Sequence, residues 1–186
     1  MYTIIGIIAL VLIGSLSQNG MNMWESLNHA MTAIATGGFS VTDDSIIGFG
    51  AVSQIAIIVL MVFGGIAFAA HYDLLKGRIK RFLSDTQFQA MILILFLGII
   101  ILTFINLNDP TQLYNNNILL SLKESGFQFI SALTCTGFAS ANIPSWTESA
   151  KLILSFARLL EGLQGQQQEV SNSFEQSFSV KVPHGG

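Results

Sequence analysis

The sequence predicts an all-α membrane protein, from its composition and from a segment order that occurs twice. Apolar residues make up 51% of the chain and charged residues 10%, whereas soluble domains carry about 25% charged residues. A transmembrane helix, a pore helix with a filter loop and a second transmembrane helix follow one another, and a constant offset that places residue 38 on residue 137 repeats this order. The net charge of −3 gives no indication of a nucleic-acid partner, so membrane lipid is the partner that composition indicates.

The first unit is predicted over residues 1–86. Thr3 to Leu16 is apolar but shorter than the roughly 20 residues of a full crossing, and we interpret it as a membrane helix. Trp24 to Ala35 has no Gly or Pro, which predicts a short helix that descends into the membrane. Ile46 to Ala70 is the next predicted crossing. Gly64 and Gly65 near its end either let another helix approach closely or mark a bend.

A basic linker then sets the orientation. Four of the eight Lys and Arg residues fall between residues 71 and 86, and they are Lys76, Arg78, Lys80 and Arg81. Cytoplasmic connections of membrane proteins are enriched in Lys and Arg. We therefore expect a multi-pass protein of the cell membrane with this linker in the cytoplasm and both pore loops on the outer side.

The second unit is predicted over residues 87–162 and is incomplete. Ala90 to Ile105 is its strongest crossing, and Ile118 to Thr134 supplies the descending helix. The last apolar stretch, Ala150 to Leu160, carries Arg158 and precedes Glu161. These two charges are one helical turn apart and either pair with each other or reflect an error in the sequence at this end.

The two loops are the candidate functional site. A Gly pair after a helix is typical of a simple C-cap, but the repetition favours a filter whose carbonyls replace the water shell of a cation. Glycine permits the backbone angles that such a loop needs. The filter backbone is expected to consist of Thr36, Gly37, Gly38, Cys135, Thr136 and Gly137. Phe39 and Phe138 are expected to wedge the loops without touching the ion.

The chain resembles the Trk/Ktr/HKT superfamily of transporters for potassium and, in some members, sodium. The resemblance rests on three stretches, which are His29 through Thr36-Gly37-Gly38-Phe39-Ser40, Gly64-Gly65 with His71-Tyr72, and Phe127-Gln128 through Thr136-Gly137-Phe138. Family members have four such units around one pore, and this chain resembles the second and third, over residues 1–162. The resemblance implies a transported K⁺ or Na⁺, a homodimer of pore subunits and a cytoplasmic nucleotide-binding regulatory subunit.

The tail, residues 163–186, departs from the family, which has a motif resembling GSTTGGIK here. Codons compatible with Gln164 to Glu175 permit GSTTGGIKLIR in an adjacent reading frame. The tail is therefore interpreted either as a frameshifted translation or as a disordered polar segment, which its Gln, Ser and Gly content also favours.

The predicted function is potassium uptake through a carbonyl filter, as a truncated pore-forming fragment. Two alternatives stay open, a non-conducting remnant and a small membrane scaffold whose glycines only pack helices. No nucleotide motif, metal-ligand spacing or Ser/His/Asp set is present, and Cys135 is the only cysteine, so we expect neither an enzyme nor a cofactor.

Overall fold

The computed structural model describes residues 2–17, 19–66, 76–84, 86–109, 114, 117–160 and 162. These residues contain α-helices, one 3₁₀ turn and connecting loops, and no strand occurs among them. The all-α prediction is therefore confirmed. His71 and Tyr72 of the family resemblance, Glu161 and the tail at 163–186 lie outside the described residues.

The first unit consists of α1 (Tyr2–Leu16), α2 (Met23–Ile34) and α3 (Ala51–Gly65). A reciprocal capping box starts α2, in which the Asn22 side chain accepts from the Glu25 backbone N–H at 2.9 Å and Glu25 accepts from the Asn22 N–H at 2.8 Å. This cap places the start of α2 within one residue of the position that the sequence predicts.

The helix α3 begins later than the predicted crossing at Ile46, because a turn precedes it. Ser45 has a positive φ of 55°. The Gln54 amide donates to the carbonyls of Ile46 and Phe49, at 3.2 and 3.1 Å, and holds the turn against the first residues of α3. The apolar residues from 46 to 50 therefore form a packed turn, with Ile46 fully buried.

The second unit contains α6 (Thr86–Leu107), α7 (Ile118–Leu133), a 3₁₀ turn (Ile143–Ser145) and a final helix over residues 148–160. The short helix α5 (Ile79–Leu83), which the sequence did not predict, lies in the basic linker. Among the described residues one helix, Phe88–Leu107, is long and apolar enough to cross a membrane, and α1 and α3 are shorter apolar helices.

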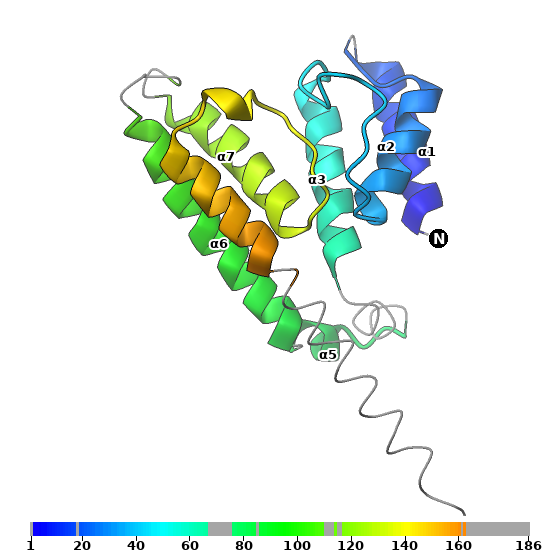
Figure 1. Cartoon of the computed structure of the whole chain (residues 1–186). Helices are drawn as coiled ribbons and strands as arrows, with labels where there is room; N and C mark the ends of the chain where they lie inside the picture. Colours follow the sequence, from blue (N-terminus) through cyan, green and yellow to red (C-terminus); the bar gives the residue numbers. More distant parts are fainter. Residues whose placement is uncertain are drawn as a thin grey trace, which may run out of the picture.

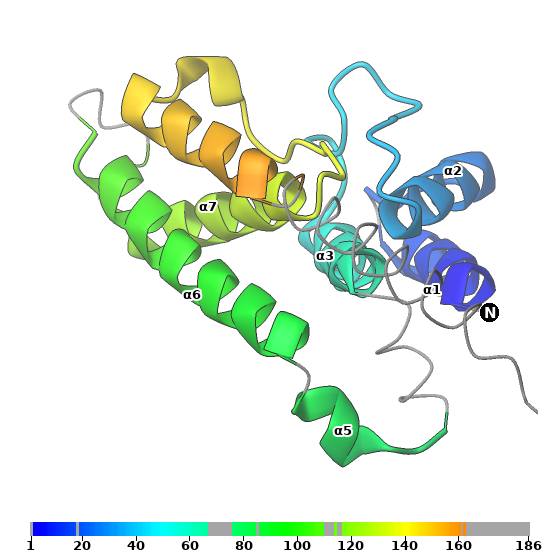
Figure 2. The same ribbon diagram turned by 60° about the horizontal axis from the view of Figure 1, so that its bottom comes forward.

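Both units follow the same path in space (Figure 1). In the first, α2 descends from one end of the molecule and stops part of the way along it, and the chain returns to that end before α3 descends. In the second, α7, its loop and the helix at 148–160 follow the same course. The helix α3 contacts α1, α2 and α7 and so joins the two units (Figure 2). The predicted short helices, each followed by a loop that turns back, are therefore present.

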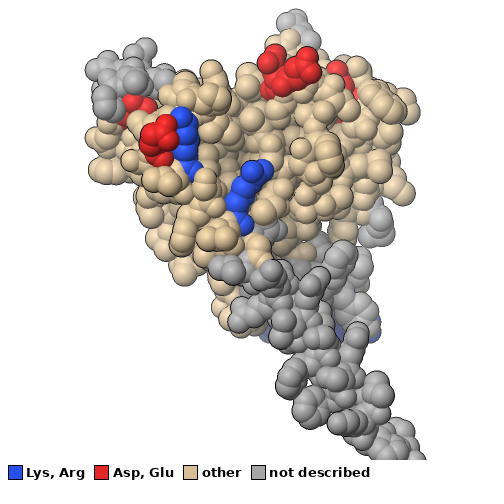
Figure 3. Space-filling model, viewed as in Figure 1, with Lys and Arg blue, Asp and Glu red and all other residues tan. Residues whose placement is uncertain are grey.

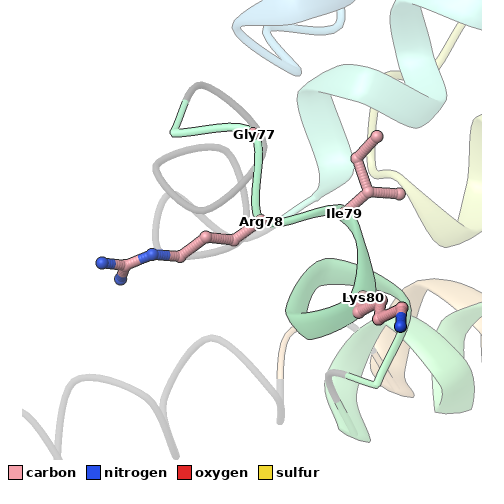
Figure 4. A pocket seen from close by; sticks show the side chains of 4 residues that line it. All are labelled: Gly77, Arg78, Ile79 and Lys80. Atoms are coloured by element: carbon pink, nitrogen blue, oxygen red, sulfur yellow. The ribbon is translucent and has the colours of Figure 1, made fainter.

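Charged side chains are sparse, and on the face shown in Figure 3 basic ones lie both beside the acidic ones and toward the middle. On the face shown in Figure 3, acidic side chains lie toward the end at which α2 and α7 start. Asp43 and Asp44 are exposed there. The basic linker lies at the opposite end, where Lys76, Arg78 and Lys80 are exposed, and Arg78 and Lys80 point to different sides of it (Figure 4).

Gly64 and Gly65 are sites of close helix contact. A Cβ on Gly64 would lie 2.7 Å from the carbonyl oxygens of Ala33 and Ile34, at the end of α2. A Cβ on Gly65 would lie 3.0 Å from the Thr134 side chain, at the end of α7. The helix α3 ends at Gly65. The two glycines therefore let one helix touch the ends of both descending helices.

We expect Gly64→Ala to destabilise the protein because its methyl group would collide with backbone atoms, which cannot move aside. Overpacking of this kind costs about 1–3 kcal/mol, and a chain of this size loses about 2–4 °C in Tm per kcal/mol. Thermal unfolding in detergent, followed by size-exclusion chromatography of the remaining folded protein, measures the shift. Gly48→Ala is the matched control, since a Cβ there meets nothing within 4 Å. Equal Tm values for the two variants would contradict the close contact.

Candidate functional site

The two predicted filter loops have the same backbone conformation. Thr36 and Cys135, which are equivalent under the internal repeat, both have φ of 49°. Gly38 and Gly137, also equivalent, have φ of 73° and 75°. Two left-handed residues separated by one other residue turn the chain sharply, and a repeated pattern of this kind is not expected by chance. The structure therefore gives the sequence repeat a matching backbone repeat.

Hydrogen bonds at the ends of the descending helices also repeat. The Gly37 N–H donates to the Thr32 carbonyl at 3.0 Å, and the equivalent Thr136 N–H donates to the Ser131 carbonyl at 3.1 Å. A bond from the second residue past the cap back to the last turn defines a Schellman C-cap, with a left-handed residue in between. The C-cap, which was the alternative interpretation of this stretch in the sequence, is thus present. Gly38 and Gly137 add a second bend beyond it.

The left-handed cap residue is not glycine in either loop. Thr36 and Cys135 hold this conformation although a side chain there costs roughly 1–2 kcal/mol. Such residues persist only where the surrounding contacts determine the backbone. The sequence placed the special backbone at the glycines alone and missed this position, because neither Thr nor Cys signals a positive φ.

The two loops lie against each other at their glycines. A Cβ on Gly38 would lie 3.5 Å from the Thr136 carbonyl oxygen, and a Cβ on Gly137 would lie 3.5 Å from the Gly38 Cα. The structure therefore brings Gly38 of the first loop against Thr136 and Gly137 of the second. It also places a main-chain oxygen of one loop beside the backbone of the other.

Further hydrogen bonds fix the second loop. The Ala139 N–H donates to the Ser45 hydroxyl at 2.9 Å, and the Ala139 carbonyl accepts from the Ile46 N–H at 3.1 Å, so the segment after the second loop pairs with the turn before α3. Within the second unit, the Ser131 hydroxyl donates to the Phe138 carbonyl at 2.7 Å. The loop backbone is therefore held from both units.

Two buried polar residues on the descending helices support the loops from behind. His29 contacts the Glu25 carbonyl through Nδ1 at 2.8 Å and the Ser40 hydroxyl through Nε2 at 3.1 Å. The equivalent Gln128, with its amide oxygen turned toward the loop, accepts from the N–H groups of Ser140 and Ala141 at 2.7 and 3.2 Å. Sequence reasoning used these residues only for the family resemblance, although a buried polar residue at the same place in both units is itself a signal.

The two predicted wedge residues differ in their surroundings. Phe138 is 2% exposed, and its ring lies 5.5 Å from the His29 ring. Phe39 is 76% exposed. Phe138 therefore lies buried between the two units, where a side chain could wedge the loops. Phe39 extends from the first unit and has no comparable pocket in the described part of the chain.

A pocket with one charged wall lies beside the second loop. Its lining includes Gly137, Phe138, Gln128, Lys151 and Arg158. A Cβ on Gly137 would lie 3.0 Å from the Arg158 guanidinium, and Lys151 forms an ion pair with Glu148 at 2.9 Å. Arg158 thus lies next to the second loop, a position that the sequence did not predict. No group of three His, Cys, Asp or Glu residues that suits a metal ion occurs among the described residues.

Short helices that end in paired loops between apolar helices are an arrangement typical of membrane transport proteins. The chain belongs to the TrkH family of cation transport proteins, because the family model described as TrkH, cation transport protein, matches residues 1–166. The resemblance inferred from the sequence is therefore confirmed.

Relatives are similar over most of the chain. An uncharacterized cation transporter of Methanocaldococcus jannaschii is 30% identical over 164 residues, which cover 87% of this chain and 30% of that protein. The Trk system potassium uptake protein TrkH of Escherichia coli K12 is 28% identical, with coverage of 78% and 30%. The chain thus spans about three tenths of the length of these relatives.

The fold is also similar to a solved structure. The crystal structure of the potassium transporter TrkH from Vibrio parahaemolyticus matches with a TM-score of 0.72 at 20% sequence identity, and covers 98% of this chain and 41% of that one. At this identity the similarity establishes the fold. The chain therefore has the helix arrangement of part of a TrkH protein.

We expect Gly38→Ala and Gly137→Ala to destabilise the fold, since an alanine at φ above 70° costs roughly 1–2 kcal/mol. Gly37→Ala is the matched control, because its φ is not positive and its Cβ would make ordinary contacts of 3.6 and 3.7 Å. Chemical unfolding in detergent measures the three variants. A loss at Gly37→Ala as large as at Gly38→Ala would show that space, and not backbone conformation, constrains this loop.

Proposed function

We propose that the chain forms part of a pore that transports potassium ions across the cell membrane, and that its two loops supply part of the filter. The observation that carries the proposal is the pair of loops with equal left-handed angles, in contact at Gly38 and Gly137. Membership of a cation transport family and similarity to potassium uptake proteins support the same function.

The chemistry of this filter is that of the main chain. Carbonyl oxygens of Thr36, Gly37 and Gly38 and of Cys135, Thr136 and Gly137 replace the water shell of a dehydrated cation. Both descending helices end at the loops, and the partial negative charge at a helix C-terminus favours a cation there. The proposed function needs no covalent chemistry at a side chain, and we therefore propose a transporter and not an enzyme.

The driving force and the direction follow from the membrane. A membrane potential contributes about 2.3 kcal/mol per elementary charge per 100 mV. We place the basic linker in the cytoplasm and the loops toward the outer side, where exposed Asp43 and Asp44 raise the local concentration of cations. K⁺ is the proposed ion, with Na⁺ as the alternative.

Partners of the whole transporter belong to the same proposal. Naming of relatives as parts of a Trk system supports assembly with further subunits. A homodimer of complete pore subunits and a cytoplasmic nucleotide-binding subunit are the partners that we propose, together with membrane lipid.

Growth of potassium-starved cells tests the transport function. Expression of the reading frame that contains this chain with all its pore units is expected to restore growth and K⁺ uptake. Gly38→Ser and Gly137→Ser are expected to lower uptake by tenfold or more, because each side chain would alter the left-handed backbone of one loop. Gly48→Ser, at an open position outside the loops, is the control.

Membrane insertion of each variant is measured by its abundance in the membrane fraction. Normal insertion with lost uptake supports the filter. Unchanged uptake in Gly38→Ser and Gly137→Ser would instead assign the glycines to helix packing, as in a membrane scaffold. Absence of uptake by the unsubstituted protein would leave a non-conducting remnant as the function.

A further inference from the structure

A buried carboxylate on α7 contacts the segment that follows the second loop. Glu124 is 7% exposed. Its two carboxylate oxygens have different partners, since the Ser140 hydroxyl donates to Oε2 at 2.5 Å and the Lys123 ammonium lies 3.1 Å from Oε1. A buried charge is costly unless it is paired and hydrogen-bonded. The two contacts together meet this requirement, and one of them is made by the chain that leaves the second loop.

The chain returns along α7 after the second loop (Figure 1). This path brings Ser140 back to the second turn of that helix, where Glu124 lies. We name residues 138–141 the post-loop segment. Each of its residues has a main-chain group that is hydrogen-bonded to another element, and the partners are Ser131 for Phe138, Ser45 and Ile46 for Ala139, and Gln128 for both Ser140 and Ala141. Glu124 adds a charged side chain to these partners.

The equivalent carboxylate of the first unit is used differently. Glu25 corresponds to Glu124 under the internal repeat, and it accepts from the Asn22 N–H at 2.8 Å in the capping box of α2. In this unit the segment after the loop is contacted by a ring nitrogen of His29, which lies 3.1 Å from the Ser40 hydroxyl. The two units therefore hold their loops with side chains of different charge.

The length of α7 explains why Glu124 can reach the loop. Under the repeat the first residue of α2, Met23, corresponds to Leu122, whereas α7 begins four residues earlier (122 − 118), at Ile118. Four residues are about one helical turn. Asn117 caps α7 with its side chain. Glu124 thus lies beyond the first turn and is not needed for capping, so its carboxylate is available to the post-loop segment.

We propose that Glu124 is a positioning residue of the second loop, and that its bond to Ser140 determines how strictly the filter discriminates between K⁺ and Na⁺. The part that concerns ions rests on the proposed function. A hydrogen bond to a charged acceptor is roughly twice as strong as one between neutral groups. Discrimination by cavity size requires a loop whose oxygens do not close around the smaller Na⁺, and Glu124 restrains the loop from its far side.

Hydrogen/deuterium exchange tests the positioning role in the protein from the reading frame with all pore units, purified into lipid nanodiscs. Ser140→Ala removes the donor, and Glu124→Gln removes the charge but keeps the shape of the side chain. Each variant is expected to speed exchange at the N–H groups of residues 139–141 about fivefold or more, because bonds to charged groups are among the stronger ones. Glu25→Gln is the matched control, since a capping box accepts either residue type.

The double variant shows whether Glu124 acts through Ser140. If it does, Glu124→Gln with Ser140→Ala exchanges no faster at residues 139–141 than the faster of the two single variants, because both remove the same bond. Additive effects would overturn the proposal, since Glu124 would then act on the loop by another route. Unchanged exchange in both single variants would overturn it as well.

Uptake of Na⁺ and K⁺ by potassium-starved cells tests the discrimination with the same reading frame. The ratio of Na⁺ to K⁺ uptake is expected to rise about threefold or more in Glu124→Gln and in Ser140→Ala, because a less restrained loop closes around the smaller ion. This ratio does not depend on the amount of folded protein, so a merely structural role would leave it unchanged. Glu148→Gln is the control for loss of one negative charge, since the Glu148 side chain is 86% exposed.

The two measurements fail separately. Faster exchange with an unchanged ion ratio would overturn the link between Glu124 and discrimination, and the proposed transport would stand. Absence of uptake by the unsubstituted protein would contradict the proposed function and with it the role in discrimination. The exchange measurement would even then decide whether Glu124 holds the second loop.

Discussion

A peptide group that leaves the helix within a membrane must find its hydrogen bonds inside the protein, and this constraint determines the site. Where a helix ends, its last carbonyls have no partner within the helix, and inside a membrane no water is present to donate hydrogen bonds to them. Both loops contain the same backbone hydrogen bond. The N–H of residue 37 donates to the carbonyl of residue 32, and the N–H of residue 136 donates to the carbonyl of residue 131. The chain can then bend again at Gly38 and Gly137 without leaving the preceding turn unsatisfied.

The same constraint explains why α3 makes close contacts with both descending helices. Gly64 and Gly65 bring α3 against the ends of both α2 and α7, and the turn before α3 pairs with Ala139. A shift of α3 would therefore move both loops relative to each other. Small residues at a helix contact allow this close approach, since close packing takes the place of hydrophobic attraction between helices in lipid.

Much of this arrangement was predictable from the sequence because the internal repeat contains the same order of segments twice. The bounds of the descending helices were predicted within one residue, since each helix is followed by its copy of the repeated loop and the two helices end at equivalent residues, Ile34 and Leu133. The turn at residues 46–50 was missed because these residues are as apolar as a membrane helix, and Gln54, which holds the turn, lies within α3. The unequal burial of Phe39 and Phe138 was also missed, since it depends on which unit covers the other.

Thr36 and Cys135 show which features of the sequence determine the backbone of the two loops. Their side chains differ in chemistry, and neither favours a positive φ, yet the two backbones share one angle. The angle must then come from what the positions have in common, which is the cap bond before each bend and the glycine two residues later. A filter that works through main-chain oxygens needs this geometry and not a particular side chain. The residue at the cap is therefore free to vary between units, whereas the glycine at the second bend is not.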